Sequence, residues 1–131
     1  MTTRALSSIL YVEDDPDIRT VARMALEVVG GFSVTVCASG AEALAAVEGD
    51  LVPDLFLLDV MMPEMDGPAT LAALRRLPSV AQVPAIFMTA KVQESEIALY
   101  NWLGAIGVVA KPFDPMQLPQ QLRRLWESGG N

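Results

Sequence analysis

The 131-residue sequence contains no histidine. This absence excludes serine or cysteine nucleophiles activated by histidine, zinc sites built on histidine, and any phosphohistidine step within the chain. The single cysteine, Cys37, cannot form an internal disulfide and is expected to be a small, buried apolar residue. Any chemistry must therefore use carboxylates, Lys111 or a group that a partner supplies.

Basic residues and long apolar runs are also scarce. Nine lysines and arginines stand against 16 acidic residues, and the resulting net charge of −7 repels nucleic acid backbones and anionic membranes. No segment has the apolar length of a membrane span or the layout of a secretory signal. The sequence therefore predicts a cytoplasmic protein that binds no nucleic acid and does not insert into membranes.

Short apolar runs rich in β-branched and aromatic residues alternate with segments of helical periodicity. This alternation predicts one α/β domain built on a parallel sheet, because 131 residues are enough for one core and too few for two ordinary ones. The expected strands are residues 9–12, 32–38, 54–58, 84–88 and 106–110.

Several polar residues mark the expected helix starts. Asp15 and Asp66 are interpreted as helix N-caps, and this role is favoured over metal binding. Ser39 and Glu42 have the spacing of a capping box. Pro119 is expected to kink the last helix or to move its start later along the chain.

Charged and hydroxyl side chains stand at the carboxyl ends of four of the expected strands. Parallel strands place these ends along one edge of the sheet, where open α/β sheets bind ligands. Each residue alone could be structural, but the coincidence across four strands indicates a shared site. The residues are Glu13, Asp14, Asp59, Thr89 and Lys111.

Three carboxylates in a partly dry crevice repel one another unless a cation compensates their charge. Mg²⁺ is the expected cation, because it prefers hard oxygen ligands and the site offers no soft ones. Lys111 would add a second positive charge, and Thr89 a hydroxyl donor. Such a set can stabilise a phosphoryl group on one of its own carboxylates.

Four ordered motifs carry a more specific signal: ILYVEDD at 9–15, PDLFLLDVMMPEMDG at 53–67, MTA at 88–90 and KPF at 111–113. Together they resemble the receiver domain of bacterial two-component response regulators. The resemblance implies a stand-alone receiver over residues 1–131, with an ordered core of about 7–126. It also implies a flavodoxin-like, doubly wound sheet of five parallel strands in the order 2-1-3-4-5, with five helices.

By this resemblance, Asp59 is the phosphoacceptor and a ligand of Mg²⁺. Asp14 would bind the ion directly, Glu13 would act as the second acid, often through water, and Met61 would contribute its backbone carbonyl. Met61 has no side-chain hydrogen bond to offer an attacking water, which predicts slower loss of the phosphoryl group than from a Met61→Asn variant.

Thr89 and Lys111 are the remaining functional residues that the resemblance implies. Thr89 would move toward the phosphoryl group and Lys111 would bind it, with the Lys111–Pro112 peptide bond expected to be cis. Phosphorylation would then shift the equilibrium between conformations of the surface formed by the fourth helix, fifth strand and last helix.

One position departs from the family pattern. Val108 stands where an aromatic residue usually rotates inward on activation. The switching role of that aromatic residue is therefore either missing or taken over by Tyr100 or Trp102. These two aromatic residues also suggest a partner-facing surface.

The sequence thus predicts a response regulator that is not an ordinary enzyme. A separate histidine kinase or phosphotransfer protein would phosphorylate Asp59, and a downstream protein would be bound or would receive the phosphoryl group. The alternative is a receiver-like interaction module that phosphorylation does not switch. Val108 in place of the usual aromatic residue favours this alternative, whereas the complete set of acids, threonine and lysine argues against it.

Two further functions are disfavoured by the sequence. A magnesium-dependent phosphohydrolase with an aspartyl phosphate is expected to carry a second aspartate where Met61 stands, and a cap domain that this chain lacks. A flavin or nucleotide binder is expected to have a glycine-rich loop after the first strand, where this chain has acids.

Overall fold

The computed structural model describes residues 4–129; residues 1–3 and 130–131, at the ends that the sequence leaves without pattern, lie outside the described part. The strands are β1 (Ser8–Val12), β2 (Ser33–Cys37), β3 (Leu55–Asp59), β4 (Ala85–Thr89) and β5 (Ala105–Ala110). The helices are α1 (Pro16–Met24), α2 (Gly40–Glu48), α3 (Gly67–Leu74), α4 (Glu94–Trp102) and α5 (Leu118–Gly129). A π-helical turn, η1 (Ala25–Val29), continues α1, and a 3-10 turn, η2 (Pro78–Val80), follows α3.

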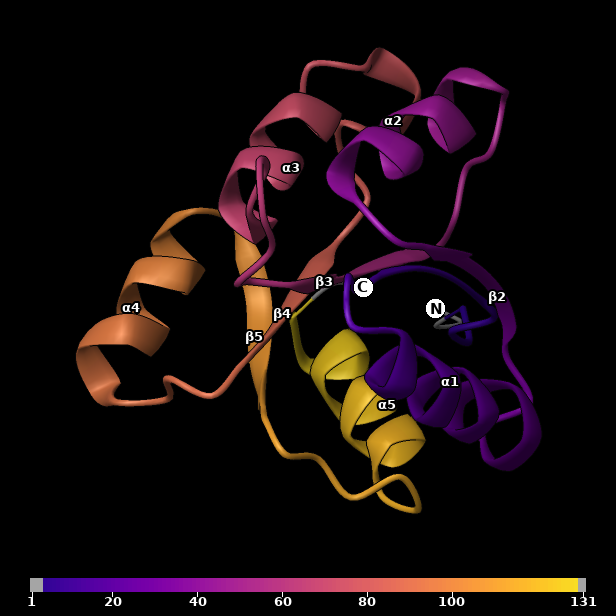
Figure 1. Ribbon diagram of the computed structural model, residues 1–131, viewed down its shortest axis with the longest axis vertical. Coiled ribbons are helices and arrows are strands. Elements are labelled where there is room, and N and C mark those ends of the chain that lie inside the picture. The colour runs from indigo at the N-terminus through magenta and orange to yellow at the C-terminus, as the bar shows by residue number, and fades with distance from the viewer. Residues whose placement is uncertain (1–3, 130–131) are drawn as a thin grey trace.

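All five strands are parallel and their order is β2-β1-β3-β4-β5, which confirms the predicted flavodoxin-like topology (Figure 1). Val12 lies opposite Leu58 in the register of β1 and β3. The residues that follow, Glu13 and Asp59, therefore reach the carboxyl edge of the sheet at the same level. The strand order thus places the first and third strands side by side beneath the predicted site.

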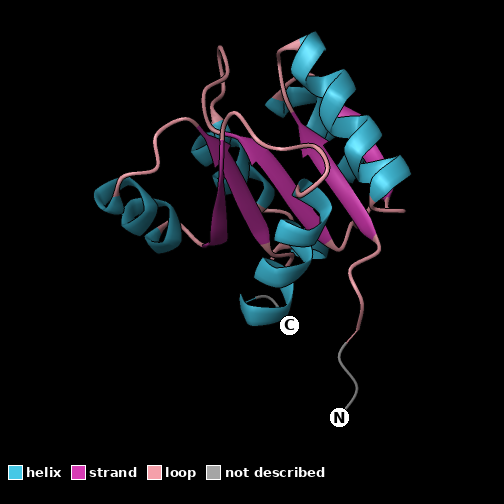
Figure 2. Ribbon diagram, turned by 90° about the horizontal axis from the view of Figure 1, so that it is seen from below, coloured by secondary structure: helices cyan, strands magenta, loops and turns pink. Residues whose placement is uncertain are grey.

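Helices cover both faces of the sheet, and Figure 2 shows the strands between them. Side chains alternate along β1: Leu10 and Val12 pack into the core beneath α2, α3 and α4, while Ile9 and Tyr11 pack into the core beneath α1 and α5. Strands β3 and β4 are buried along their whole length, as expected for central strands covered on both faces.

The predicted N-caps are confirmed. The Asp15 side chain accepts hydrogen bonds from the first turn of α1, and Asp66 accepts one from the Ala69 amide at the start of α3. The predicted capping box of α2 differs in one bond: Ser39 caps the Glu42 amide, but the Glu42 carboxylate accepts from the Ala38 amide instead of the Ser39 amide.

The start of α5 agrees with the proline residues in the sequence. Asp114 and Pro115 form a turn, and α5 begins only at Leu118, so Pro119 lies in its first turn, where its missing N–H is tolerated. Helix α4 begins at Glu94, after Gln93 as its N-cap. Among residues 4–129, no helix has both the length and the apolar character needed to cross a bilayer.

Candidate functional site

The predicted site residues meet in one pocket at the carboxyl edge of the sheet. The pocket has a volume of about 260 Å³ and lies where β1, β3, β4 and β5 end. Its lining contains all six residues singled out from the sequence, together with Asp15, Ile18 and Ala90. The six are Glu13, Asp14, Asp59, Met61, Thr89 and Lys111.

The three predicted acids form a compact cluster. One carboxylate oxygen each from Glu13, Asp14 and Asp59 lies within 4.8 Å of the others. Glu13 and Asp59 are buried, whereas Asp14 is half-buried. The donor set is made of hard oxygens at a separation that one small divalent cation can bridge, with water where a carboxylate stands back. The residues therefore fit Mg²⁺.

Lys111 joins the ends of the first and third strands. Its ammonium donates to Asp59 Oδ1 at 2.8 Å and to Glu13 Oε1 at 2.9 Å, and its side chain is only 17% exposed. Burial by itself lowers the pKa of this lysine, but the bonds to Asp59 and Glu13 outweigh it and the net pKa is raised. Lys111 therefore keeps its positive charge beside Asp59 at neutral pH.

The carboxyl of Glu13 has a raised pKa. Burial raises the pKa of its carboxyl from 4.5 to about 7; the Lys111 hydrogen bond opposes this rise and the negative charge of Asp59 adds to it. The carboxylate also accepts from the Tyr11 hydroxyl at 3.5 Å and from the Asp15 amide at 3.3 Å. A bound cation would favour the ionised form, so protons and cation compete for this residue.

The raised pKa of Glu13 predicts a pH dependence of stability without Mg²⁺. Between about pH 4.5 and 7 the folded protein holds a proton on Glu13 that the unfolded chain has released, so the free energy of unfolding falls as the pH rises through this window. Urea unfolding at several pH values, with EDTA or with Mg²⁺, measures it. A Glu13→Gln variant should lose this part of the slope, and Mg²⁺ should reduce it in the parent protein; a slope equal in both proteins would contradict the assignment.

Thr89 ends β4 inside the pocket and is 1% exposed. Its hydroxyl oxygen accepts a hydrogen bond from the Lys91 amide at 3.0 Å, which ties it to the β4–α4 loop. Because this bond uses a lone pair, the hydroxyl proton stays available for an acceptor in the pocket. The structure thus places Thr89 beside the acids and connects it to the loop that leads into α4.

Gly67 contributes to the site in a way that sequence reasoning missed. A Cβ atom at this position would lie 2.6 Å from the Asp59 carbonyl oxygen and 3.0 Å from Val60 Cα, both backbone atoms. The Gly67 amide also donates to the Val60 carbonyl at 2.9 Å. The start of α3 therefore lies directly against the backbone of Asp59, a contact that only glycine allows. The sequence motif at 53–67 includes Gly67, but it does not indicate that this residue contacts the backbone of Asp59.

Arg19 was also missed from the sequence. It lies on α1 with its side chain half-buried, and Nη1 donates to the Glu13 carbonyl at 3.0 Å and to the Asp14 carbonyl at 3.1 Å. An arginine on a helix face gives no sequence signal for such a contact.

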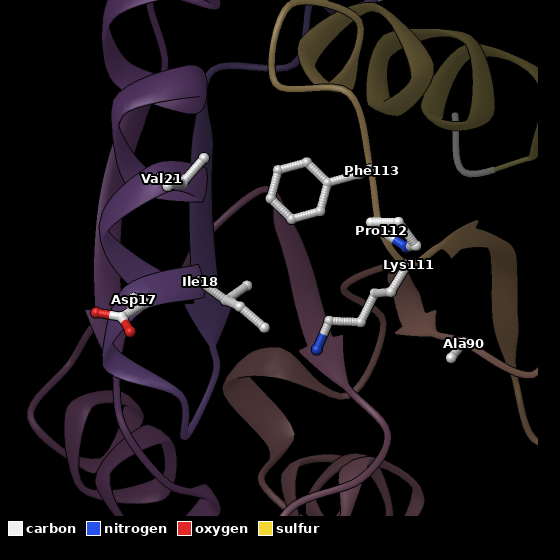
Figure 3. A pocket seen from close by; sticks show the side chains of 7 residues that line it. All are labelled: Asp17, Ile18, Val21, Ala90, Lys111, Pro112 and Phe113. Carbon is white, nitrogen blue, oxygen red and sulfur yellow. The ribbon is translucent and has the colours of Figure 1, made fainter.

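An apolar hollow of about 520 Å³ adjoins the acid pocket (Figure 3). The two share Ile18, Ala90 and Lys111, and the hollow continues over Val21 and Phe113. The Lys111–Pro112 peptide bond at its rim is cis, as predicted. In Figure 3 the Phe113 ring points across the hollow toward α1. An apolar surface therefore borders the charged pocket.

The two aromatic residues on α4 differ in their surroundings. Tyr100 is buried, with its ring 5.3 Å from that of Phe87 in an edge-to-face contact, so its expected place on a partner-facing surface is wrong. Trp102 is 81% exposed. Val108 is half-buried and lines a second hollow with residues of α4 and α5.

Known proteins share both the sequence pattern and the fold. The family described as response regulator receiver domain matches residues 9–123. A 14.6 kDa protein of Leptolyngbya boryana, described as uncharacterized, is 41% identical over 118 residues, which are 90% of this chain and 88% of that protein. The transcriptional regulatory protein CseB of Streptomyces coelicolor is 37% identical over 93% of this chain and 52% of its own length. This chain therefore spans about half of CseB.

A solved structure agrees with these relatives. The chemotaxis protein CheY4 of Vibrio cholerae superposes with a TM-score of 0.83 at 30% identity, covering 92% of this chain and 99% of that one. The fold, the ordered motifs and the family match point the same way. The chain belongs to the receiver domain family of two-component response regulators.

Proposed function

We propose that this domain accepts a phosphoryl group on Asp59 in the presence of Mg²⁺, from the phosphohistidine of a histidine kinase or phosphotransfer protein. The observation that carries the proposal is Lys111, which bridges Asp59 and Glu13 beside an acid cluster fitted for one divalent cation. The histidine donor must lie outside these 131 residues, because they contain no histidine. The proposal includes a cytoplasmic location.

The transfer exchanges one bond to phosphorus for another. The bond between phosphorus and the donor imidazole breaks, and a bond to an Asp59 carboxylate oxygen forms. When bound, Mg²⁺ neutralises charge on the phosphoryl oxygens, and Asp14, Asp59, Glu13 and the Met61 carbonyl would hold it. Lys111, now paired with Asp59 Oδ1, would shift its hydrogen bond to a phosphoryl oxygen.

Thr89 connects this chemistry to the surface. Its hydroxyl proton can be donated to a phosphoryl oxygen, while its oxygen is bonded to the Lys91 amide before α4. Movement of Thr89 toward Asp59 would pull the β4–α4 loop in the same direction. This shift would favour another arrangement of α4, β5 and α5. A downstream protein would bind that surface, or the phosphoryl group would pass to another partner.

The phosphodonor has an apolar place to dock beside Lys111. Ile18, Val21 and Phe113 line the hollow that opens next to the acid pocket. Apolar contact there would position a partner's histidine near Asp59, with no need for charge attraction to a domain of net charge −7.

Intact-mass analysis after incubation with acetyl phosphate tests the proposal. One added phosphoryl group is expected with Mg²⁺, and none with EDTA. An unmodified chain under both conditions would instead favour the interaction module that phosphate does not switch.

Met61 sets the expected lifetime of the phosphoryl group. Its side chain is 65% exposed next to Asp59 and has no group that can orient an attacking water by hydrogen bonding. A Met61→Asn variant should lose the phosphoryl group faster, by roughly fivefold, because one useful hydrogen bond is worth about 1 kcal/mol. The decay of the adduct mass after removal of acetyl phosphate measures this rate.

A Met61→Leu variant is the matched control, since leucine is also unable to hold the water. Its adduct should decay as slowly as that of the parent protein. An asparagine variant that keeps its phosphoryl group longer than the parent would contradict the prediction.

A further inference from the structure

We infer that Arg19 is a positioning residue for the cation site, because it fixes the backbone on which two of the acids stand. The inference rests on the proposed Mg²⁺-dependent function and adds a residue that the four motifs do not assign a role. Arg19 does not itself line the pocket; its described hydrogen bonds go to the backbone carbonyls of Glu13 and Asp14, and through them it acts on the site.

The geometry supports a clamp between α1 and the loop before it. A single guanidinium nitrogen reaches two consecutive carbonyls, at 3.0 Å for Glu13 and 3.1 Å for Asp14. Two carbonyl dipoles that converge on one point repel each other unless a positive donor lies between them, and charge-assisted bonds are the stronger kind. Removing the donor should therefore let the peptide between Glu13 and Asp14 turn.

The orientation of this peptide matters for the acids. The Glu13 amide is held by the Cys37 carbonyl at 3.0 Å, and Asp15 is held by its cap on α1. Asp14 lies between these two fixed points and supplies the half-buried acid of the cluster. With Arg19 in place, the carboxylates of Glu13 and Asp14 keep the spacing that fits one cation.

Charge and positioning predict opposite results for Arg19, which makes the inference testable. Arg19 is a positive group near a site that binds a positive ion. If it acted only through its charge, its removal would strengthen Mg²⁺ binding. If it positions the loop, its removal weakens Mg²⁺ binding, in the way that loss of an outer contact to metal ligands usually does.

Arg23 offers a matched control on the same helix. It lies one turn further along α1, its side chain is 58% exposed, and its Nε pairs with Glu27 at 3.2 Å. An Arg23→Met change removes the same charge from the same helix without touching the loop.

Calorimetric titration of Mg²⁺ into the parent protein and the Arg19→Met, Arg19→Lys and Arg23→Met variants tests the inference. Arg19→Met should bind Mg²⁺ roughly tenfold more weakly than the parent, with Arg23→Met unchanged or slightly tighter. Arg19→Lys keeps a charged donor but has a shorter reach, so its affinity should fall between those of the parent and Arg19→Met.

Urea unfolding in EDTA, run beside the titrations, separates positioning from a purely structural role. A purely structural role would lower the stability of the metal-free Arg19 variants and leave the Mg²⁺ affinity of their folded fraction unchanged. That result, or equal or tighter binding by Arg19→Met or by Arg19→Lys, overturns the inference. Absence of Mg²⁺ binding by the parent protein would instead overturn the proposed function itself.

Discussion

An Asp59→Asn variant is expected to form no phosphoryl adduct with acetyl phosphate and Mg²⁺, whereas the parent protein gains one phosphoryl group. Asparagine has nearly the shape of aspartate, but its amide has no carboxylate oxygen that can attack phosphorus. The change also removes one acid from the cluster and the negative charge that pairs with the Lys111 ammonium. Intact-mass analysis of both proteins under the same conditions measures the difference.

Asp66→Asn is the matched control for this experiment. Asp66 lies in the loop that follows β3 and caps α3 through the Ala69 amide, a role that asparagine fills about equally well. This variant should be phosphorylated like the parent protein. An adduct that persists in Asp59→Asn would move the acceptor to another residue and would sink the assignment.

Gly67→Ala should both destabilise the fold and slow phosphorylation. The new methyl group would lie 2.6 Å from the Asp59 carbonyl oxygen, and a backbone atom cannot swing away as the end of a side chain can. Either α3 or the end of β3 must shift, at a cost of about 1–3 kcal/mol, the usual cost of overpacking. Urea unfolding gives the loss of stability, and the rate of adduct formation shows whether Asp59 has moved.

Gly49→Ala provides the comparison for the same chemical change. Gly49 follows α2, and a Cβ atom there would come no closer than 3.5 Å to its neighbours, an ordinary contact distance. Stability and adduct rate should stay near those of the parent protein. If alanine at position 67 were equally harmless, the close approach of α3 to Asp59 would have no functional weight.

The sheet and the meeting point of the site residues could be predicted because both depend on local signals and one general rule. The local signals mark where helices and strands begin and end. They are the apolar runs, the capping residues Asp15 and Asp66, and Pro119 at the start of the last helix. The rule is that parallel strands bring their carboxyl ends to one edge. Once the alternation of strands and helices was clear, residues as distant as Glu13 and Lys111 had to approach that edge.

The remaining features depend on how helices rotate and pack, which no short sequence pattern encodes. The burial of Tyr100 follows from the face that α4 turns toward Phe87. The reach of Arg19 to two loop carbonyls depends on the register of α1 against β1. The π-helical turn η1 adds width to the helix just before Gly30, although the sequence there reads as an ordinary apolar stripe.

Lys111 is synthesised after the acids that it contacts in the folded site. This lysine comes 98 residues after Glu13 and 52 residues after Asp59, the two acids that it bridges. A nascent chain that has emerged only as far as β4 therefore carries all three acids of the cluster and lacks the ammonium that offsets them. Until β5 leaves the exit tunnel, mutual repulsion among these acids works against closing that edge of the sheet.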